Sequence, residues 1–223
     1  MALTNEGLAK LDGTRAPFFP YAKEQFSREE MDYFINMLRQ YFIQVDRFSG
    51  SLIDNVGGAY LSNPQGAFQD LTSQTTTANT ATVMKFNTTD FSNDVTVVTS
   101  GGLPTRLTVA NAGLYNLQWS GQFQNSDNAV HDASVWLRVN GTDLAGSTGF
   151  ISIPARRAAG AGNEGHAVIG WNYFVQLNAG QYVEIWWSTT NAAVTLHYYP
   201  PGVSPTRPAT ASVIATLSYV SRL

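Results

Sequence analysis

The stretch Asn111-Ala112-Gly113-Leu114-Tyr115-Asn116-Leu117-Gln118-Trp119 decides the fold class of this chain. It starts as a polar turn that contains glycine and continues as a run in which apolar and polar residues alternate as far as Phe123. One set of side chains points one way: Tyr115, Leu117, Trp119 and Phe123. The other set points the opposite way: Asn116, Gln118, Ser120 and Gln122. A period of two residues is typical of a half-buried antiparallel strand.

The stretch Asn178-Ala179-Gly180-Gln181-Tyr182, which leads to Trp186, echoes the first one. Almost all of the chain after residue 66 shows the same texture of short strands and turns. Strands are predicted at residues 67–75, 82–88, 94–99, 105–109, 114–124, 133–139, 167–177, 181–188, 193–199 and 211–220. Asn140-Gly141 after an apolar run predicts a tight hairpin. Many short strands without intervening helices predict a mainly β fold, an antiparallel sandwich or jelly roll.

Composition limits the function classes. Charged residues make up 13% of the chain, about half the usual fraction. The net charge of −3 provides no electrostatic footprint for nucleic acid. The absence of cysteine excludes disulfides, thiolate metal sites and cysteine nucleophiles. No secretory signal is visible at the N-terminus, and no apolar run approaches the roughly 20 residues of a membrane span, so no membrane insertion is expected.

The N-terminal part is built differently, because residues 1–50 carry 13 of the 29 charged side chains. Residues 1–26 are predicted to form an extended arm, in which prolines hold an apolar segment extended. Two interpretations stay open: the arm packs on its own domain, or it docks into a partner. The candidate anchors in the arm are Pro17, Phe18, Phe19, Pro20 and Tyr21.

Residues 27–50 predict one amphipathic helix. Ser27 is a good N-cap, Glu30 completes a capping box, and Gly50 is placed to end the helix. Its apolar face combines Met31, Phe34, Ile35, Leu38, Phe42 and Val45, which are also candidates for anchoring a partner. This face either packs on the same domain or forms a small parallel bundle around a symmetry axis. Residues 51–66 are expected to be a linker before a head at 67–223.

Several features of residues 67–223 resemble the jelly-roll head of the complement-globular-head and tumour necrosis factor families. Gly113-Leu114-Tyr115 is similar to the family's Gly-x-Tyr, and Val135-Trp136-Leu137-Arg138-Val139-Asn140-Gly141 to its strand that ends in Asn-Gly. Val175-Gln176-Leu177-Asn178-Ala179-Gly180-Gln181-Tyr182-Val183 resembles its Leu-x-x-Gly-Asp-x-Val segment, and Val213-Ile214-Ala215-Thr216-Leu217 its closing strand.

The chain departs from the family at Gln181, where Asp is usual, and in a closing strand without Phe-x-Gly. It also lacks a collagen-like stalk, so the resemblance implies the fold but not animal signalling. The resemblance further implies a homotrimer, with Tyr115, Trp119, Trp186 and Tyr219 as candidates for the core or the subunit interface. Few charges, many Asn, Thr and Gln residues, an arm, a helix and a head together resemble phage virion proteins.

Candidate chemistry is weak. Gly160-Ala161-Gly162-Asn163-Glu164-Gly165 matches the dinucleotide motif, but no strand precedes it and no helix follows, so a flexible loop is expected. His131, His166 and His197 lack metal-site spacing, and His131-Asp132 is placed in a turn. Glu184 lies opposite the apolar face of its strand, which favours a solvated or interface role. No catalytic residue, cofactor or metal is predicted.

The sequence therefore predicts a non-enzymatic structural protein on the external surface of a phage virion. It would be a trimeric capsid decoration or head-fibre protein, anchored to a capsid or tail protein through residues 1–50. The alternative is a tail fibre or receptor-binding protein that recognises host surface glycan through the loops at 125–132, 142–166 and 200–209. In that alternative Arg156-Arg157 would contact the glycan or a partner's carboxylates; otherwise they form a solvated loop tip.

Overall fold

The computed structural model describes residues 27–53, 63–160 and 162–223. Contacts divide the chain into two compact units, Met1–Ser62 and Asn63–Leu223. The predicted arm and its five anchor candidates, Pro17 to Tyr21, lie outside the described residues, as does most of the predicted linker. We call Asn63–Leu223 the β unit.

The first unit contains the predicted helix, α2 (Arg28–Ile53). Its start agrees with the predicted cap: the Glu30 amide donates to Ser27 Oγ at 3.4 Å, and the Met31 amide donates to the Ser27 carbonyl at 3.1 Å. The predicted end at Gly50 is wrong, because the helix continues to Ile53. One glycine lowers helix propensity by only about 1 kcal/mol and ends a helix only where the backbone leaves the helical region. In the described part of the chain, no helix combines the length and apolar content that a membrane crossing requires.

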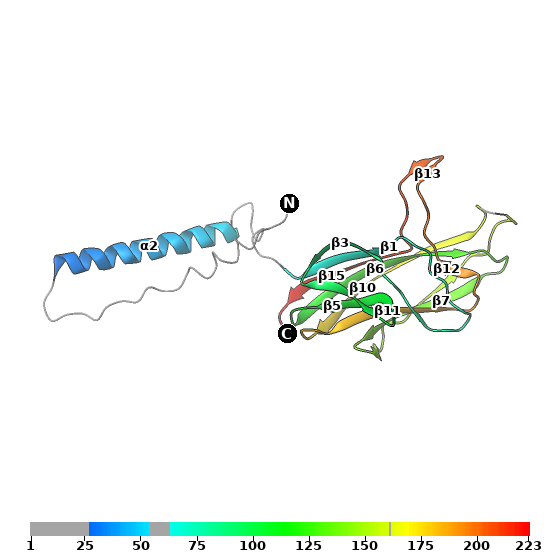
Figure 1. The fold of residues 1–223 in the computed structure, drawn as a ribbon, viewed down its shortest axis with the longest axis horizontal. Helices are drawn as coiled ribbons and strands as arrows, with labels where there is room; N and C mark the ends of the chain where they lie inside the picture. The colour runs from blue at the N-terminus through cyan, green and yellow to red at the C-terminus, as the bar shows by residue number, and fades with distance from the viewer. Residues whose placement is uncertain (1–26, 54–62, 161) are drawn as a thin grey trace. The chain divides into compact units, whose positions relative to one another are not determined.

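The β unit consists of two antiparallel sheets and a small hairpin (Figure 1). The first sheet, sheet A, runs in the order β10 (Gly165–Leu177), β6 (Gly113–Asn125), β15 (Val213–Ser221), β1 (Gln65–Asp70) and β3 (Thr88–Asn93). β12 (Val194–Leu196) also pairs with β6.

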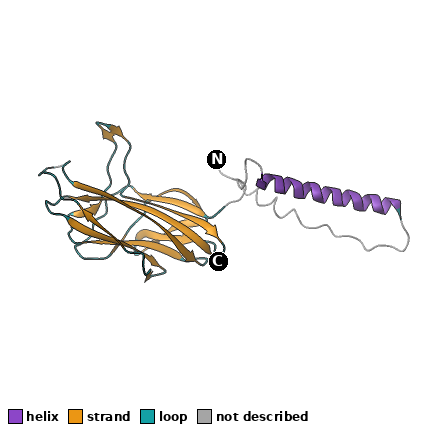
Figure 2. Cartoon of the chain, turned by 180° about the vertical axis from the view of Figure 1, so that it is seen from behind, coloured by secondary structure: helices purple, strands orange, loops and turns teal. Residues whose placement is uncertain are grey.

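The second sheet, sheet B, runs in the order β4 (Val95–Ser100), β5 (Leu103–Val109), β11 (Tyr182–Thr189), β7 (His131–Val139) and β8 (Thr142–Asp143). β2 (Thr82–Val83) pairs with β11, and β9 (Gly149–Ile153) pairs with β7. The remaining hairpin, β13 (Gly202–Val203) and β14 (Thr206–Arg207), projects from the body of the β unit (Figures 1 and 2).

The central strand of sheet A is β6, which is the stretch that the alternation singled out. It pairs with β10 over its full length on one side and with β15 on the other, so that Trp119 lies opposite Trp171 and Ala215. The predicted facing is confirmed: Tyr115, Leu117 and Phe123 are fully buried, whereas Gln118 is exposed.

The core lies between the two sheets, which pack face to face as a β-sandwich. Phe123 of sheet A meets Trp187 of sheet B with ring centroids 5.9 Å apart, edge to face. Aliphatic residues from both sheets surround this contact, among them Leu117, Leu177 and Ile185. The mainly β, antiparallel class with one amphipathic helix is therefore confirmed, and the jelly-roll assignment stays a prediction.

Two predictions about strands and loops are wrong. Residues 82–88 are not one strand, because only 82–83 form β2 and Thr88 already begins β3. Between these strands the backbone of Lys85 is bonded by the Gln74 side chain, which donates to the Lys85 carbonyl and accepts from its amide, both at 3.0 Å. The predicted loop at 142–166 contains β9, whose segment Gly149–Ile153 adds an edge to sheet B. The predicted Asn140-Gly141 hairpin is confirmed: both residues have positive φ, 48° and 82°, and connect β7 to β8.

Candidate functional site

The predicted anchor residues of α2 lie along one apolar stripe. Met31, Ile35 and Phe42 are exposed by 42%, 43% and 57%. The other members, Phe34, Leu38 and Val45, are partly covered. The stripe thus presents apolar area that α2 does not bury within itself.

The four candidates for the trimer interface separate into two groups. Tyr115 is fully buried and Trp119 is 6% exposed, so of the two alternatives, core or subunit interface, both residues belong to the core of the single chain. Trp186 and Tyr219 are half-buried. Tyr219 packs edge to face on Tyr115 at 5.6 Å. A side chain that its own chain already removes from water has no surface left to offer another subunit.

The outward side of β10, β6 and β15 carries no Asp, Glu, Lys or Arg. Three cross-strand rows define it, here called the uncharged face: Phe174, Asn116 and Ser218; Asn172, Gln118 and Thr216; Gly170, Ser120 and Ile214. Val168 extends it along β10. Its apolar members are well exposed: Val168 by 63%, Phe174 by 54% and Ile214 by 48%.

The outward side of sheet B is different, because it carries interlocked charges and aromatic rings. We call this set the arginine–aromatic ladder, and it comprises Arg106, Trp136, Arg138, Asp143, Tyr182, Glu184 and Trp186. The guanidinium of Arg106 lies 4.2 Å from the Tyr182 ring centre, and that of Arg138 lies 3.9 Å from the Trp186 ring. Each is a cation–π contact.

Carboxylates tie the ladder together. Arg106 Nε lies 3.3 Å from Glu184 Oε1, and the Trp186 indole donates to Glu184 Oε2 at 3.2 Å. Arg138 Nε donates to Asp143 Oδ1 at 2.7 Å. This hydrogen bond lowers the pKa of Asp143 and raises that of Arg138.

The prediction of a solvated or interface role for Glu184 is wrong. Its side chain is 7% exposed, beneath the guanidinium of Arg106, and it also accepts a bond from Thr105 Oγ1 at 3.2 Å. A carboxylate can be buried only where donors replace its water. Here three donors from β5 and β11 do so.

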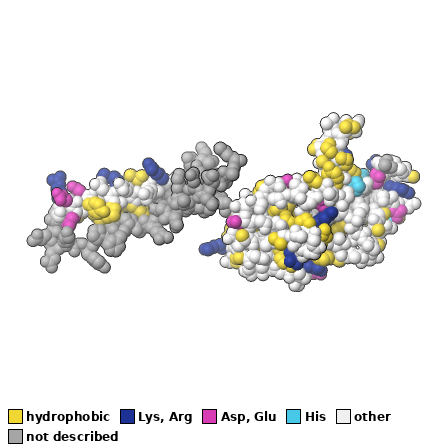
Figure 3. Space-filling model, viewed as in Figure 1, with side chains coloured by type: hydrophobic (Ala, Val, Ile, Leu, Met, Phe, Trp, Pro, Cys, Tyr) yellow, Lys and Arg dark blue, Asp and Glu magenta, His cyan; other side chains and the backbone are white. Residues whose placement is uncertain are grey.

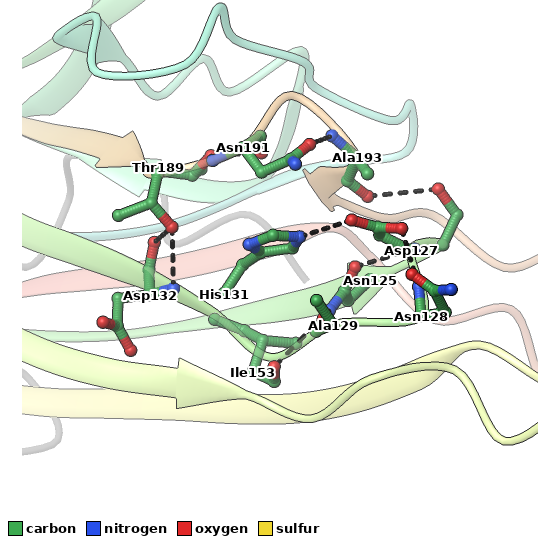
Figure 4. A network of polar contacts seen from close by, with 12 residues as sticks. Asn125, Asp127, Asn128, Ala129, His131, Asp132, Ile153, Thr189, Asn191 and Ala193 are labelled. Carbon is green, nitrogen blue, oxygen red and sulfur yellow. Dashed lines mark hydrogen bonds and ion pairs between the residues drawn. The ribbon is translucent and has the colours of Figure 1, made fainter.

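A polar network closes one end of the sandwich (Figure 4). His131 does not lie in a turn, as predicted, but is the first residue of β7. Its Nε2 lies 2.7 Å from Asp127 Oδ2, and this contact is the main reason why the pKa of Asp127 is lowered. Asn125 braces the same loop, because its side-chain amide donates to the Ala129 carbonyl at 2.8 Å. Asp132, the sequence neighbour of His131, instead accepts from Ser152 Oγ at 2.6 Å.

The other two histidines meet at Tyr199, which sequence reasoning did not connect with them. His166 Nδ1 lies 3.0 Å from the Tyr199 hydroxyl, and the His197 ring lies 4.6 Å from the Tyr199 ring. Burial raises the pKa of Tyr199 to about 12 and lowers that of His197. Among the described residues, no group of three or more His, Asp or Glu side chains is arranged to hold a metal ion.

In the glycine-rich match, the described residues Gly160 and 162–164 lie outside the strands, and Gly165 is the first residue of β10. Gly160 and Gly162 have φ values of 103° and 85°, which favour glycine. A Cβ at Gly165 would collide with the Pro154 carbonyl oxygen, so this glycine permits two backbones to approach. The motif therefore has a local structural reason.

Comparison with known proteins gives no family for this chain. Neither a scan against protein-family models nor a search of curated proteins finds a match.

Proposed function

We propose that this protein is a homotrimeric structural component of a phage virion, a capsid decoration or head-fibre protein on its external surface. The uncharged face of sheet A is the observation that carries the proposal. A sheet face of exposed Val, Ile and Phe among neutral polar residues suits a subunit interface, because charge is depleted at the centres of interfaces. Three copies related by a rotation would bring this face of each chain to the same axis.

The spacing in α2 supports the same assembly. Apolar residues follow each other at steps of three and four: Met31, Phe34, Leu38, Tyr41 and Val45. Asp32, Arg39 and Asp46 occupy another side of the helix. Such a pattern is that of helices that associate along an apolar seam. Three parallel copies of α2 would bury the exposed parts of Met31, Ile35 and Phe42.

The virion role rests on the resemblance of the whole chain to phage structural proteins. The N-terminal residues 1–50 would attach the trimer to a capsid or tail protein, with the arm as the docking segment. Three arms on one trimer would bind with avidity, which raises apparent affinity by roughly 10²–10⁴ where the geometry allows simultaneous contact.

Light scattering on the purified chain tests the trimer. The wild type is expected at three times the 24.3 kDa chain mass. Phe174→Asp, which buries a charge at the interface, should yield a folded monomer. Phe150→Asp is the matched control, because Phe150 is 79% exposed on the outward side of β9 in sheet B, and it should remain trimeric. A monomeric wild type would overturn the proposal.

Particle imaging tests the virion role. A label on the C-terminal unit is expected across the head surface, and a chain lacking residues 1–26 should lose its place on the particle. Absence of the label from purified particles contradicts the virion role, whatever the oligomeric state.

Receptor recognition through the outer loops is the second candidate. The hairpin β13–β14 favours it, because this hairpin projects from the β unit and Val203 at its turn is 90% exposed. Hydrophobic side chains lie along it (Figure 3). A glycan array separates the two candidates: specific binding that is lost on shortening residues 200–209 favours recognition, and label confined to the tail would agree with it.

A further inference from the structure

Both guanidinium groups of the arginine–aromatic ladder are fixed in place, and both keep N–H donors that are not used within the ladder. Each is held at Nε by a carboxylate and on its face by an aromatic ring. Among the described residues, no hydrogen bond occupies the Nη groups of Arg106 or Arg138. Both side chains reach solvent, with exposures of 35% and 23%.

The groups around these donors add further polar positions. Asp143 accepts two hydrogen bonds at the same oxygen, Oδ1: one from Arg138 Nε at 2.7 Å and one from the Trp136 indole at 2.9 Å. Its side chain is 57% exposed, and Oδ2 accepts no bond from the described residues. Trp136 lies directly opposite Trp186 in the register of β7 and β11. The surface therefore combines paired N–H donors, an open carboxylate oxygen and half-buried rings.

We propose that the ladder binds a carboxylate-bearing sugar, such as a uronic or sialic acid unit of a surface polysaccharide. The Nη pair of an arginine matches the two oxygens of a carboxylate, and a stacked guanidinium is already oriented for this bidentate contact. Sugar hydroxyl groups would donate to Asp143 Oδ2, and the ring would lie against Trp136.

The polar character of the ladder favours a sugar over a protein partner. Guanidinium groups cover Tyr182 and Trp186, and no ladder ring is among the well-exposed hydrophobic side chains. The dry apolar centre of a protein interface is thus missing here. A small polar ligand instead needs a few fixed polar groups, which the ladder provides at little ordering cost.

The charges of the ladder also set the expected strength of binding. Two arginines are balanced by Glu184 and Asp143, so long-range attraction of an anion is small. Single-site affinity should be weak. Repetition of the site on each chain would strengthen binding to a polysaccharide; this last step rests on the proposed trimer, whereas the site itself does not.

Titration calorimetry on the full chain tests the site with two acidic probes, an oligogalacturonate and sialyllactose. The matched neutral probes are the methyl esters of the same two sugars, which keep every ring and lose the carboxylate charge. At least one acidic probe should bind, about tenfold or more tightly than its neutral counterpart, because the ester loses the charge-assisted pair.

Variants assign the binding to the ladder. Arg138→Gln and Arg106→Gln should each weaken binding of the acidic probe about tenfold. Arg138→Lys should weaken binding as well, because a lysine keeps the charge but loses the paired N–H donors of the guanidinium. Arg222→Gln is the control, since it makes the same charge change at an exposed residue that follows β15. Thermal unfolding and light scattering on the same samples show whether each variant is folded and whether the oligomer is intact.

Three results overturn the site: no binding of either acidic probe at millimolar concentration by the folded wild type, equal binding of acid and neutral probes, or an equal loss with Arg222→Gln. The proposed trimer is judged separately by the mass of these samples, so a trimer that binds no sugar removes only the sugar site.

Discussion

The two echoing stretches start their strands alike but place their aromatic residues on opposite sides. In β6 the Tyr and Trp after Asn-Ala-Gly, Tyr115 and Trp119, face the core. In β11 the corresponding Tyr182 and Trp186 face outward and carry the guanidinium groups of Arg106 and Arg138. The same local signal therefore supplies the core in one sheet and a surface in the other.

The reason lies in the residues between Tyr and Trp. In β6 the side chains in phase with Tyr115 are apolar, with Leu117 and Phe123, and the opposite set is polar. In β11 the set in phase with Tyr182 contains Glu184, whereas the opposite set contains Val183, Ile185 and Trp187. Placing a carboxylate in the core costs more free energy than leaving two aromatic rings partly exposed. The set with Val183, Ile185 and Trp187 therefore faces the core.

The largest expected contrast comes from the two tryptophans. Trp119→Ala should lower the free energy of unfolding by about 3–5 kcal/mol, because it empties core volume. Trp186→Ala should lower it by about 2 kcal/mol, because it removes one cation–π partner, half-buried area and the indole donor to Glu184. Denaturant unfolding of both variants measures the difference. Equal losses would contradict the opposite facing of the two strands.

The next contrast concerns the carboxylate that decides the facing of β11. Glu184→Ala should destabilise the β unit by about 1–3 kcal/mol, since it leaves the donors of Thr105, Arg106 and Trp186 without their acceptor. The partial exposure of Arg106 keeps the effect below that of a fully buried pair. Glu164→Ala serves as the control, because Glu164 is only half-buried and accepts an exposed bond from the Gly162 amide, and a similar loss there would argue against a special role for Glu184.

A smaller contrast separates the two tyrosine hydroxyls. The Tyr115 hydroxyl donates to the Asn111 carbonyl at 2.7 Å, which ties the turn to its own strand. Tyr115→Phe should cost about 1 kcal/mol. The Tyr182 hydroxyl has no hydrogen bond to the described residues, so Tyr182→Phe should leave the unfolding free energy unchanged. Unfolding midpoints of this pair check the expectation, and the reverse order would refute it.

The smallest effects should appear in the pH dependence of stability. Burial is the main reason why the pKa of Tyr115 lies above its usual 10.0, so its contribution is complete below pH 10 and is lost as the pH rises through the folded value. The Arg138 contact lowers the pKa of Asp143 below 3.8, so its contribution is complete above that value and is lost as the pH falls through the lowered one.

Melting temperatures between pH 2 and 12, measured against the wild type, test these signs. Tyr115→Phe should reduce the loss on the alkaline side only, and Asp143→Asn should reduce the loss on the acid side only. A change on the opposite side in either variant would show that the stated cause of the pKa shift is wrong.

Local sequence determined the elements whose signals are complete within a few residues. The cap at Ser27, the Asn140-Gly141 turn and the alternation of β6 were all predictable, because each depends on bonding or side-chain period inside one segment. Missed elements lack such a signal: β9 is a short edge strand, and the Lys85 backbone is bonded by a side chain eleven residues away.

Only the tertiary structure decided which side chains meet. Tyr115 and Trp119, which were candidates for either the core or the interface, lie in the core, and Arg106 of β5 and Arg138 of β7 come together on β11 around Glu184 and Trp186. By itself the sequence determined the helix start, the Asn140-Gly141 turn and most of the longer strands. Long-range pairing determined which side of each strand is buried and how the strands are aligned. A single strand has two sides, and only a neighbouring strand and a second sheet decide which of them is buried.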